Sequence, residues 1–207
     1  MELIKKYFPE LNSIQLSQYS ELFDHYKNWN DKINVVSRKD IDNLYLHHVL
    51  HSMALIKIIQ FTAGIKVLDL GAGGGFPSIP LAIYFPQVYF VSLDSTKKKL
   101  SVIDAISESI GLKNIITTHE RVEEHKGHYQ FVVSRAVAEY NKLVQWSKPL
   151  ISKQQMMAIP NGLFCYKGNQ AEQEFGPNPK SKIEKFDISD HFEEAYFVEK
   201  SIYYQSL

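Results

Sequence analysis

The sequence has a single cysteine, Cys165, so no disulfide can form within the chain. It has no apolar run of about twenty residues, the length needed for a transmembrane helix. The segment Met1–Lys6 lacks the apolar core of a signal peptide, and we therefore expect a cytoplasmic protein. Neither sign of charge is in excess, with 23 basic and 23 acidic side chains. Any contact with RNA must therefore be local, because the whole chain exerts no long-range attraction on phosphates.

Glycine is scarce, with ten residues in all, yet four of them fall within residues 71–75. They follow a run of strand length, residues 65–70, and precede Pro77, which suits the first turn of a helix. This order predicts a strand, a tight loop and a helix. Glycines let the backbone approach a ligand closely, and the helix start offers free amide hydrogens. The segment therefore indicates a site for a nucleotide-like cofactor.

The spacing of these glycines separates two classes of cofactor. A dinucleotide fingerprint, G-x-G-x-x-G, would need glycine where this chain has Phe76 or Ser78. What fits is an acid, Asp69, two residues before Gly71 in a G-x-G-x-G run that includes Gly73, and this resembles the first motif of class I S-adenosylmethionine-dependent methyltransferases. An acid at the strand end suits the methionine ammonium of that cofactor. The alternative is a glycine loop that only turns a corner between strand and helix.

A second acid supports the cofactor interpretation. The β-branched and aromatic run 88–93 ends at Asp94, about twenty residues after the glycines, where a carboxylate can accept both ribose hydroxyls. Asp94 could also be the N-cap of the helix that follows. We expect it to play both roles.

The rest of the chain predicts an α/β fold with a helical extension. Apolar residues at helical spacing over 12–30, with Asn12 and Gln15 as a capping box, indicate an amphipathic helix whose aromatic stripe packs in the core. Asp40 is placed to cap a second helix that runs to about residue 59. We expect residues 1–62 to form this extension and 63–207 the main domain.

Strands and helices alternate in the main domain, which predicts a Rossmann-like, doubly wound, mostly parallel seven-stranded sheet with helices on both faces. Residues 174–180 predict a surface loop. The expected strands are 65–70, 88–93, 114–118, 129–134 and 163–166, the helices 77–84, 96–110, 140–146 and 149–155, and the closing hairpin 183–188 with 196–204.

The carboxyl ends of parallel strands meet at one edge of a sheet, where such folds bind their ligands. The residues that come just after the predicted strands include Gly71, Asp94, Val122, Glu123 and Arg135. The topology therefore brings these five residues, from four separate segments, to one crevice.

The second predicted helix contains three histidines, His47, His48 and His51, in one stretch of five residues. No further ligand follows at a convincing spacing, so we expect no metal site. Their expected role is structural, unless the helix borders the pocket, in which case His48 or His51 could position a substrate.

Several short motifs occur together in this order: Trp29–Asn30 with Asn34, His48–Leu50 with Ser52, residues 69–77 with 79–81, Leu93–Ser95 with Lys97–Lys98, Arg121–Glu123, Ser134–Ala136 and Lys167–Gly168. Together they resemble the bacterial 16S ribosomal RNA guanine-N7 methyltransferases, also called glucose-inhibited division protein B. The chain departs from the family pattern at three places, with His51 where an acid is usual, Val36 where threonine is usual and Ser78 where glycine is common.

The resemblance implies S-adenosyl-L-methionine as cofactor, with contacts from Gly71, Phe76, Val122, Glu123 and Arg135. It implies N7 of a guanine in 16S ribosomal RNA as the methyl acceptor. N7 carries a free lone pair, so in-line transfer requires no general base and we assign no catalytic residue.

On the substrate side, Arg135 could orient the cofactor or the base. Asn34, His48 and Lys167 are the candidate RNA contacts. We expect a monomer that acts on 16S ribosomal RNA within the small ribosomal subunit.

Two other functions stay open at this stage. One is a methyltransferase that acts on a small molecule or a protein; the chain has Ser134–Val137 where enzymes that methylate amino nitrogens often carry an N/D-P-P-Y/F motif. The other is a ribosome-binding module without catalysis.

Overall fold

A computed structural model of the chain describes residues 1–175 and 182–207, so the surface loop predicted over 174–180 lies mostly outside the described residues. In the described part, seven strands form one sheet in the order β3-β2-β1-β4-β5-β7-β6. The strands are β1 Lys66–Leu70, β2 Tyr89–Asp94, β3 Ile115–His119, β4 Phe131–Arg135, β5 Gly162–Gly168, β6 Ile183–Asp187 and β7 Lys200–Ser206. The first five are parallel, and β7 runs antiparallel to β5 and β6, which confirms the predicted fold and the closing hairpin.

The order of the strands reverses beside β1. The chain moves from β1 outward to β2 and β3, then returns to place β4 on the other side of β1. The connections that follow β1 and β4 therefore leave the sheet in opposite directions. A crevice opens between them, above the carboxyl ends of these two strands.

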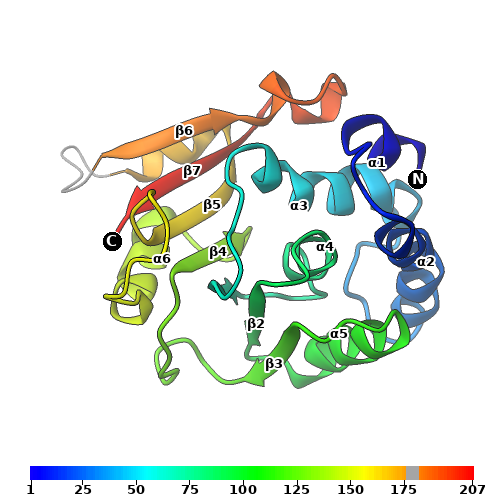
Figure 1. The fold of residues 1–207 in the computed structure, drawn as a ribbon, viewed down its shortest axis with the longest axis horizontal. Helices are drawn as coiled ribbons and strands as arrows, with labels where there is room; N and C mark the ends of the chain where they lie inside the picture. The colour runs from blue at the N-terminus through cyan, green and yellow to red at the C-terminus, as the bar shows by residue number, and fades with distance from the viewer. Residues whose placement is uncertain (176–181) are drawn as a thin grey trace.

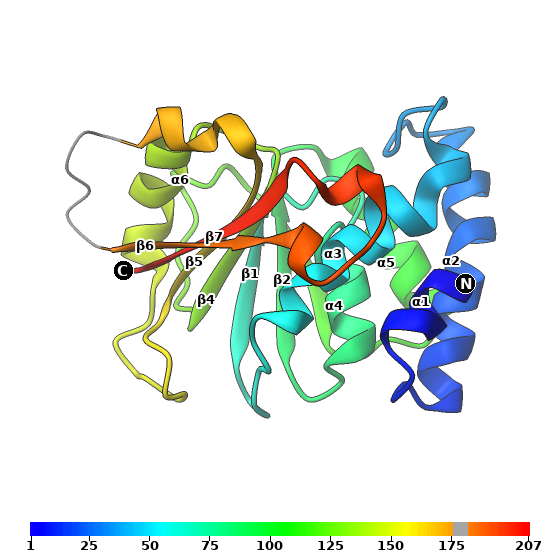
Figure 2. The same ribbon diagram turned by 90° about the horizontal axis from the view of Figure 1, so that it is seen from above.

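Helices cover both faces of the sheet (Figures 1 and 2). On one face lie α4 (Ser78–Tyr84) and α5 (Lys97–Ser109), and α2 (Ser13–Asn30) packs outside them. On the other face lies α6 (Tyr140–Ser147). The sheet is therefore the middle layer, as the alternation of strands and helices predicts.

The N-terminal helix α2 is anchored to the main domain through its aromatic stripe. Tyr19 and Tyr26 are fully buried, and their hydroxyls donate to the carbonyls of Pro80 and Gly74, each at 2.7 Å. The predicted capping box is confirmed, since Asn12 and Gln15 exchange bonds between side chain and backbone. The stripe is core, as expected, and its second tyrosine holds the glycine-rich loop.

The short helix α1 (Glu2–Tyr7) packs beside the segment that precedes β7. Lys6 Nζ lies 2.8 Å from a carboxylate oxygen of Glu193, and the Tyr7 hydroxyl donates to Glu194 at 2.9 Å. The segment in question contains the 3₁₀ turns η6 (Ile188–Asp190) and η7 (Ala195–Phe197). The start of the chain therefore supports a stretch far away in the sequence.

The second predicted helix is present, but its winding is not regular. It runs as a 3₁₀ turn η1 (Ile41–Asn43), a π-helix η2 (Leu44–Leu50), α3 (His51–Met53) and a 3₁₀ turn η3 (Ala54–Lys57). The prediction that Asp40 caps this helix is wrong, because its side chain makes no capping bond and instead binds His47 and His48. A π turn is common at functional sites, and this one borders the crevice.

The helix predicted over 149–155 is also wrong. Helical winding ends in the 3₁₀ turn η4 (Lys148–Leu150), and Ile151 is extended. The Ser152 amide donates to the Tyr129 carbonyl at 2.8 Å, so the backbone pairs beside the start of β4 instead of continuing as a helix.

Candidate cofactor and substrate site

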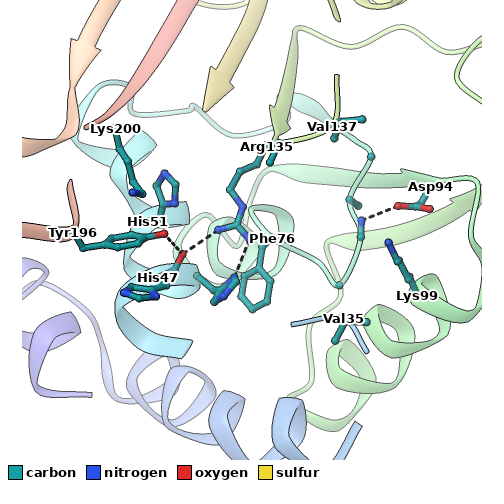
Figure 3. A pocket seen from close by; sticks show the side chains of 16 residues that line it. Val35, His47, His51, Phe76, Asp94, Lys99, Arg135, Val137, Tyr196 and Lys200 are labelled. Carbon is teal, nitrogen blue, oxygen red and sulfur yellow. Dashed lines mark hydrogen bonds between the residues drawn. The ribbon is translucent and has the colours of Figure 1, made fainter. Parts of the chain in front are cut away.

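Three adjoining cavities lie at the carboxyl edge of the sheet. The central cavity, of about 620 Å³, contains residues 71–74, Phe76 and Asp94 in its wall (Figure 3). The small cavity, of about 250 Å³, contains Val122 and Glu123, and the outer cavity, of about 540 Å³, contains residues 166–168. A volume of several hundred Å³ suits a ligand of cofactor size.

The glycine-rich loop joins the central and small cavities. Gly71 has a φ of +74° and lines both of them. A Cβ atom on Gly71 would collide with the Val137 side chain, which packs directly on this glycine. The loop therefore needs glycine here both for its conformation and for the close approach of a second chain segment.

Asp94 fixes the loop from the end of β2. Its carboxylate accepts the Gly73 amide at 2.9 Å and the Thr96 amide at 2.7 Å. The N-cap interpretation of Asp94 is wrong, because α5 begins at Lys97 and Thr96 occupies the N-cap position. Each carboxylate oxygen keeps a further lone pair, and Asp94 lines both the central and the small cavity.

Asp69 lies beneath the loop. It is fully buried, and one carboxylate oxygen accepts the Ser78 amide at 3.0 Å at the start of α4. The other oxygen has no hydrogen-bond partner among the described residues. Burial raises the pKa of Asp69 to about 6, against the hydrogen bonds from Ser78 that lower it. Asp69 does not line the central, small or outer cavity, and its buried carboxylate supports the glycine-rich loop and the start of α4 from below.

Arg135 is the centre of the cavity wall. In Figure 3 it lies with Phe76 between Asp94 on one side and Tyr196 and Lys200 on the other. Its guanidinium carbon is 5.2 Å from the centroid of the Phe76 ring. Its N–H groups donate to the His47 carbonyl at 3.3 Å and to Nδ1 of His48 at 3.2 Å.

His48 links Arg135 to Asp40. Its Nε2 is 2.8 Å from one Asp40 oxygen, while Nδ1 of His47 is 2.6 Å from the other. Burial and the neighbouring Arg135 charge lower the pKa of His48 to about 4. The ring is therefore neutral at physiological pH.

His51 lies on the wall shared by the central and outer cavities. It is only 8% exposed, and its Nε2 has no partner among the described residues. Burial first, then the charges of Arg135 and Lys200, lower its pKa well below the usual value. The chain thus has a neutral ring where the family pattern has an acid.

The structure brings most of the predicted site residues together. Val122 and Glu123 line the small cavity, whereas Lys167 lines the outer one. Lys167 Nζ already binds the Ala138 carbonyl at 2.7 Å and Glu174 at 2.6 Å. Asn34 is exposed on the neighbouring loop, and its neighbour Val35 reaches the central cavity instead.

Sequence reasoning missed several residues of the central cavity, among them Val35, Val137, Tyr196 and Lys200. Lys99, from the first turn of α5, also lines this cavity. Tyr196 and Lys200 come from the closing hairpin and its approach, where the sequence has no motif. Topology beyond β5 was needed to place them.

The described ranges, 1–175 and 182–207, contain no group of three or more His, Cys, Asp or Glu side chains that could hold a metal ion. Among the helices of the same ranges, none is long and apolar enough to cross a membrane.

Comparison with known proteins identifies the family. A family model described as rRNA small subunit methyltransferase G, GidB, matches residues 14–195. The ribosomal RNA small subunit methyltransferase G of Bacteroides thetaiotaomicron is 50% identical over 207 residues, 100% of both chains. The protein of the same name from Phocaeicola vulgatus is 49% identical over 100% of this chain and 99% of the relative.

A solved structure supports the fold. The ribosomal protein L11 methylase from Lactobacillus delbrueckii subsp. bulgaricus matches with a TM-score of 0.55 at 13% identity, over 76% of this chain and 77% of that one. The resemblance found in the sequence motifs is confirmed by the full-length relatives. The chain belongs to the GidB family, the rRNA small subunit methyltransferases G.

Proposed function

We propose that this methyltransferase transfers the methyl group of S-adenosylmethionine to N7 of a guanine in 16S ribosomal RNA. The observation that carries the proposal is the position of Arg135, a hydrogen-bond donor held between the glycine-rich loop and the open side of the central cavity. Guanine presents N7 and O6 side by side, and both are acceptors. A cationic donor beside this edge favours guanine over adenine, whose corresponding edge carries a donor.

The residues of the two inner cavities fit the cofactor. Leu70, Leu93 and Val122 give the small cavity an apolar wall for the adenine, and Asp94 stands between the cavities for the ribose. Asp69 lies beneath the loop and not in the cavity wall, and we propose that its unpartnered carboxylate oxygen attracts the methionine ammonium from there. When bound, S-adenosylmethionine supplies a methyl group activated by its sulfonium. We propose the remaining contacts at Gly71, Gly73, Phe76 and Glu123.

The reaction requires positioning rather than proton transfer. The bond from the methyl carbon to sulfur breaks as the bond from N7 forms, and sulfur keeps the electron pair, so no proton moves. Arg135 holds O6 and thereby fixes N7 in line with the methyl carbon. Phe76 and His48 keep the guanidinium from rotating away. His48, Asn34 and Lys167 are proposed as the contacts to the surrounding RNA.

We propose that the substrate is 16S RNA within the small ribosomal subunit, that the enzyme works as a monomer, and that it acts in the cytoplasm, where subunits mature. Charge balance supports the particle as substrate, because a protein with 23 basic and 23 acidic groups cannot rely on phosphate neutralisation. Residues 1–62 form the proposed extension on the substrate side. They carry Val35, His47, His48 and His51 to the central cavity.

The test is transfer of labelled methyl to small subunits from cells that lack this activity, followed by borohydride and aniline treatment, which cleaves RNA at N7-methylguanine. One new cleavage site in 16S RNA is the expected result. Label without cleavage would contradict N7 as target. Cofactor binding without RNA labelling would favour a small-molecule or protein acceptor, and no cofactor binding at all would favour a non-catalytic ribosome-binding module.

The substrate form needs a separate comparison. Free 16S RNA and assembled small subunits are offered at the same concentration. We expect the subunit to be methylated faster, and equal rates would contradict recognition of the particle.

A further inference from the structure

Asp40 is not part of the cavity wall in the described residues, yet it reaches that wall through two consecutive histidines. One carboxylate oxygen is 2.6 Å from His47 Nδ1, and the other is 2.8 Å from His48 Nε2. Burial alone would raise the pKa of Asp40, but the hydrogen bonds from His48 and His47 lower it below the usual value. Asp40 is therefore an ionised acceptor for both rings.

The two neighbours of His48 determine which ring nitrogen carries the proton. Arg135 can only donate, so Nδ1 of His48, 3.2 Å from its Nη2, must present a lone pair. An ionised carboxylate can only accept, so Nε2 must carry the hydrogen toward Asp40. Both bonds form together only in the neutral ring with hydrogen on Nε2.

The other tautomer would break the contact with Arg135. With hydrogen on Nδ1, an N–H group would face the Arg135 N–H at the same position, and two donors repel. A neutral imidazole changes tautomer freely unless one of its hydrogen bonds selects the form. In this protein the Asp40 carboxylate makes the selection together with Arg135, each from its own side of the ring.

We infer that Asp40 is a positioning residue for methyl transfer: it fixes His48 as the Nε2–H tautomer and thereby holds Arg135 over Phe76 in the orientation that binds the target base. The same carboxylate fixes His47, whose ring stacks on Tyr196 with 3.8 Å between ring centroids. One half-buried loop residue therefore fixes the orientation of two side chains of the cavity wall. The part that concerns the base rests on the proposed function.

Nuclear magnetic resonance tests the tautomer directly. Long-range proton–nitrogen correlation spectra of the full chain labelled with nitrogen-15 distinguish the two neutral forms, and His48→Gln identifies the His48 signals by their loss. We expect the Nε2–H pattern in the native protein and a shift toward the Nδ1–H form in Asp40→Ala. An unchanged His48 pattern in Asp40→Ala would overturn the inference.

Kinetics tests the consequence for the reaction. Asp40→Ala is expected to lower kcat about tenfold, the usual loss when a supporting hydrogen bond is removed, with cofactor affinity unchanged. Asp42→Asn, which removes an exposed acid from the same segment, is the matched control and should change neither the spectrum nor the rate. A normal rate in Asp40→Ala would refute the positioning role.

A double-mutant comparison tests the tautomer mechanism by a second route. Glutamine at position 48 can donate to Asp40 and accept from Arg135 but has no tautomers. In the His48→Gln background, Asp40→Ala should therefore change the rate less than about twofold, since little coupling is left between the two positions. A full tenfold loss in that background would overturn the tautomer mechanism.

These readouts separate the inference from the proposed function. The spectra require no RNA, so they decide the role of Asp40 even if native enzyme fails to methylate a guanine. Failure of the native enzyme to methylate would count only against the proposed function.

Discussion

Arg135 and Tyr26, from two different parts of the chain, both pack on the ring of Phe76. The Arg135 guanidinium carbon is 5.2 Å from the Phe76 centroid, and the Tyr26 ring stacks on Phe76 with 4.6 Å between centroids. The stack joins the end of β4, the glycine-rich loop and α2. The cofactor loop and the proposed base contact are therefore parts of one rigid unit.

Arg135→Lys should reduce methyl transfer at least about 100-fold while leaving the fold intact. Lysine keeps the charge but loses the planar fork that both stacks on Phe76 and donates in two directions. Cleavage at N7-methylguanine measures the rate, and the melting temperature serves as the control. Turnover within a few-fold of the native rate would remove Arg135 from the proposed mechanism.

Tyr26→Phe should destabilise the protein by about 1 kcal/mol, because it keeps the stacked ring but removes the hydroxyl that donates to Gly74. The buried Gly74 carbonyl loses this partner next to the cofactor loop. Chemical denaturation measures the free energy of unfolding. Tyr203→Phe is the matched control, since the Tyr203 hydroxyl is buried without a partner among the described residues and its loss should cost nothing.

Asp69→Asn should abolish one component of the pH dependence of stability. The pKa of Asp69 is raised from 3.8 to about 6 in the folded protein, so the folded state binds a proton at a pH at which the unfolded state does not. The contribution of Asp69 to the free energy of unfolding therefore increases as the pH falls through about 6, and it is complete below pH 3.8.

Relative to Asp69→Asn, the native protein should gain about 2 kcal/mol between pH 7.5 and pH 4.5. Unfolding free energies of the two proteins at both pH values give the difference directly. A constant difference would show that Asp69 is ionised in the folded state throughout this range. Taking the difference cancels the contributions of His48 and His51, whose lowered pKa values act with the opposite sign.

Ser78→Gly, which restores the residue common in the family, should destabilise this chain by about 1–2 kcal/mol. The buried Ser92 hydroxyl donates to Ser78 Oγ at 2.8 Å and would lose its acceptor. The double variant with Ser92→Ala should recover part of that cost. Additive losses in the double-mutant cycle would mean that the two hydroxyls are not coupled.

The sheet and the inner half of the site follow from local rules. The parallel strands β1, β2, β4 and β5 are short, largely buried runs, and Gly71, Asp94 and Arg135 lie at the carboxyl ends of three of them, so topology alone brings them together. The glycine spacing identifies the class of ligand because it constrains the backbone itself. These parts could be predicted since neighbours in sequence determine them.

The outer half depends on contacts between distant segments. The sequence predicts that Asp40 caps a helix, because aspartate favours the N-cap position. In the structure a π turn brings two histidines to its carboxylate instead. Periodicity cannot separate a π turn from regular helix over seven residues. Tyr196 enters the cavity because β7 inserts between β5 and β6, and no local signal in its own segment encodes that insertion.

The pairing of Lys6 with Glu193 and of Tyr7 with Glu194 matters for how the enzyme is handled in the laboratory. These contacts hold the segment that carries Tyr196, so we expect a purification tag joined ahead of Met1 to disturb them and, through them, the part of the cavity wall that Tyr196 forms. Tagged enzyme can then show weak RNA methylation with normal cofactor binding. Recombinant protein for the assays above is best tagged after Leu207 or freed of its tag before use.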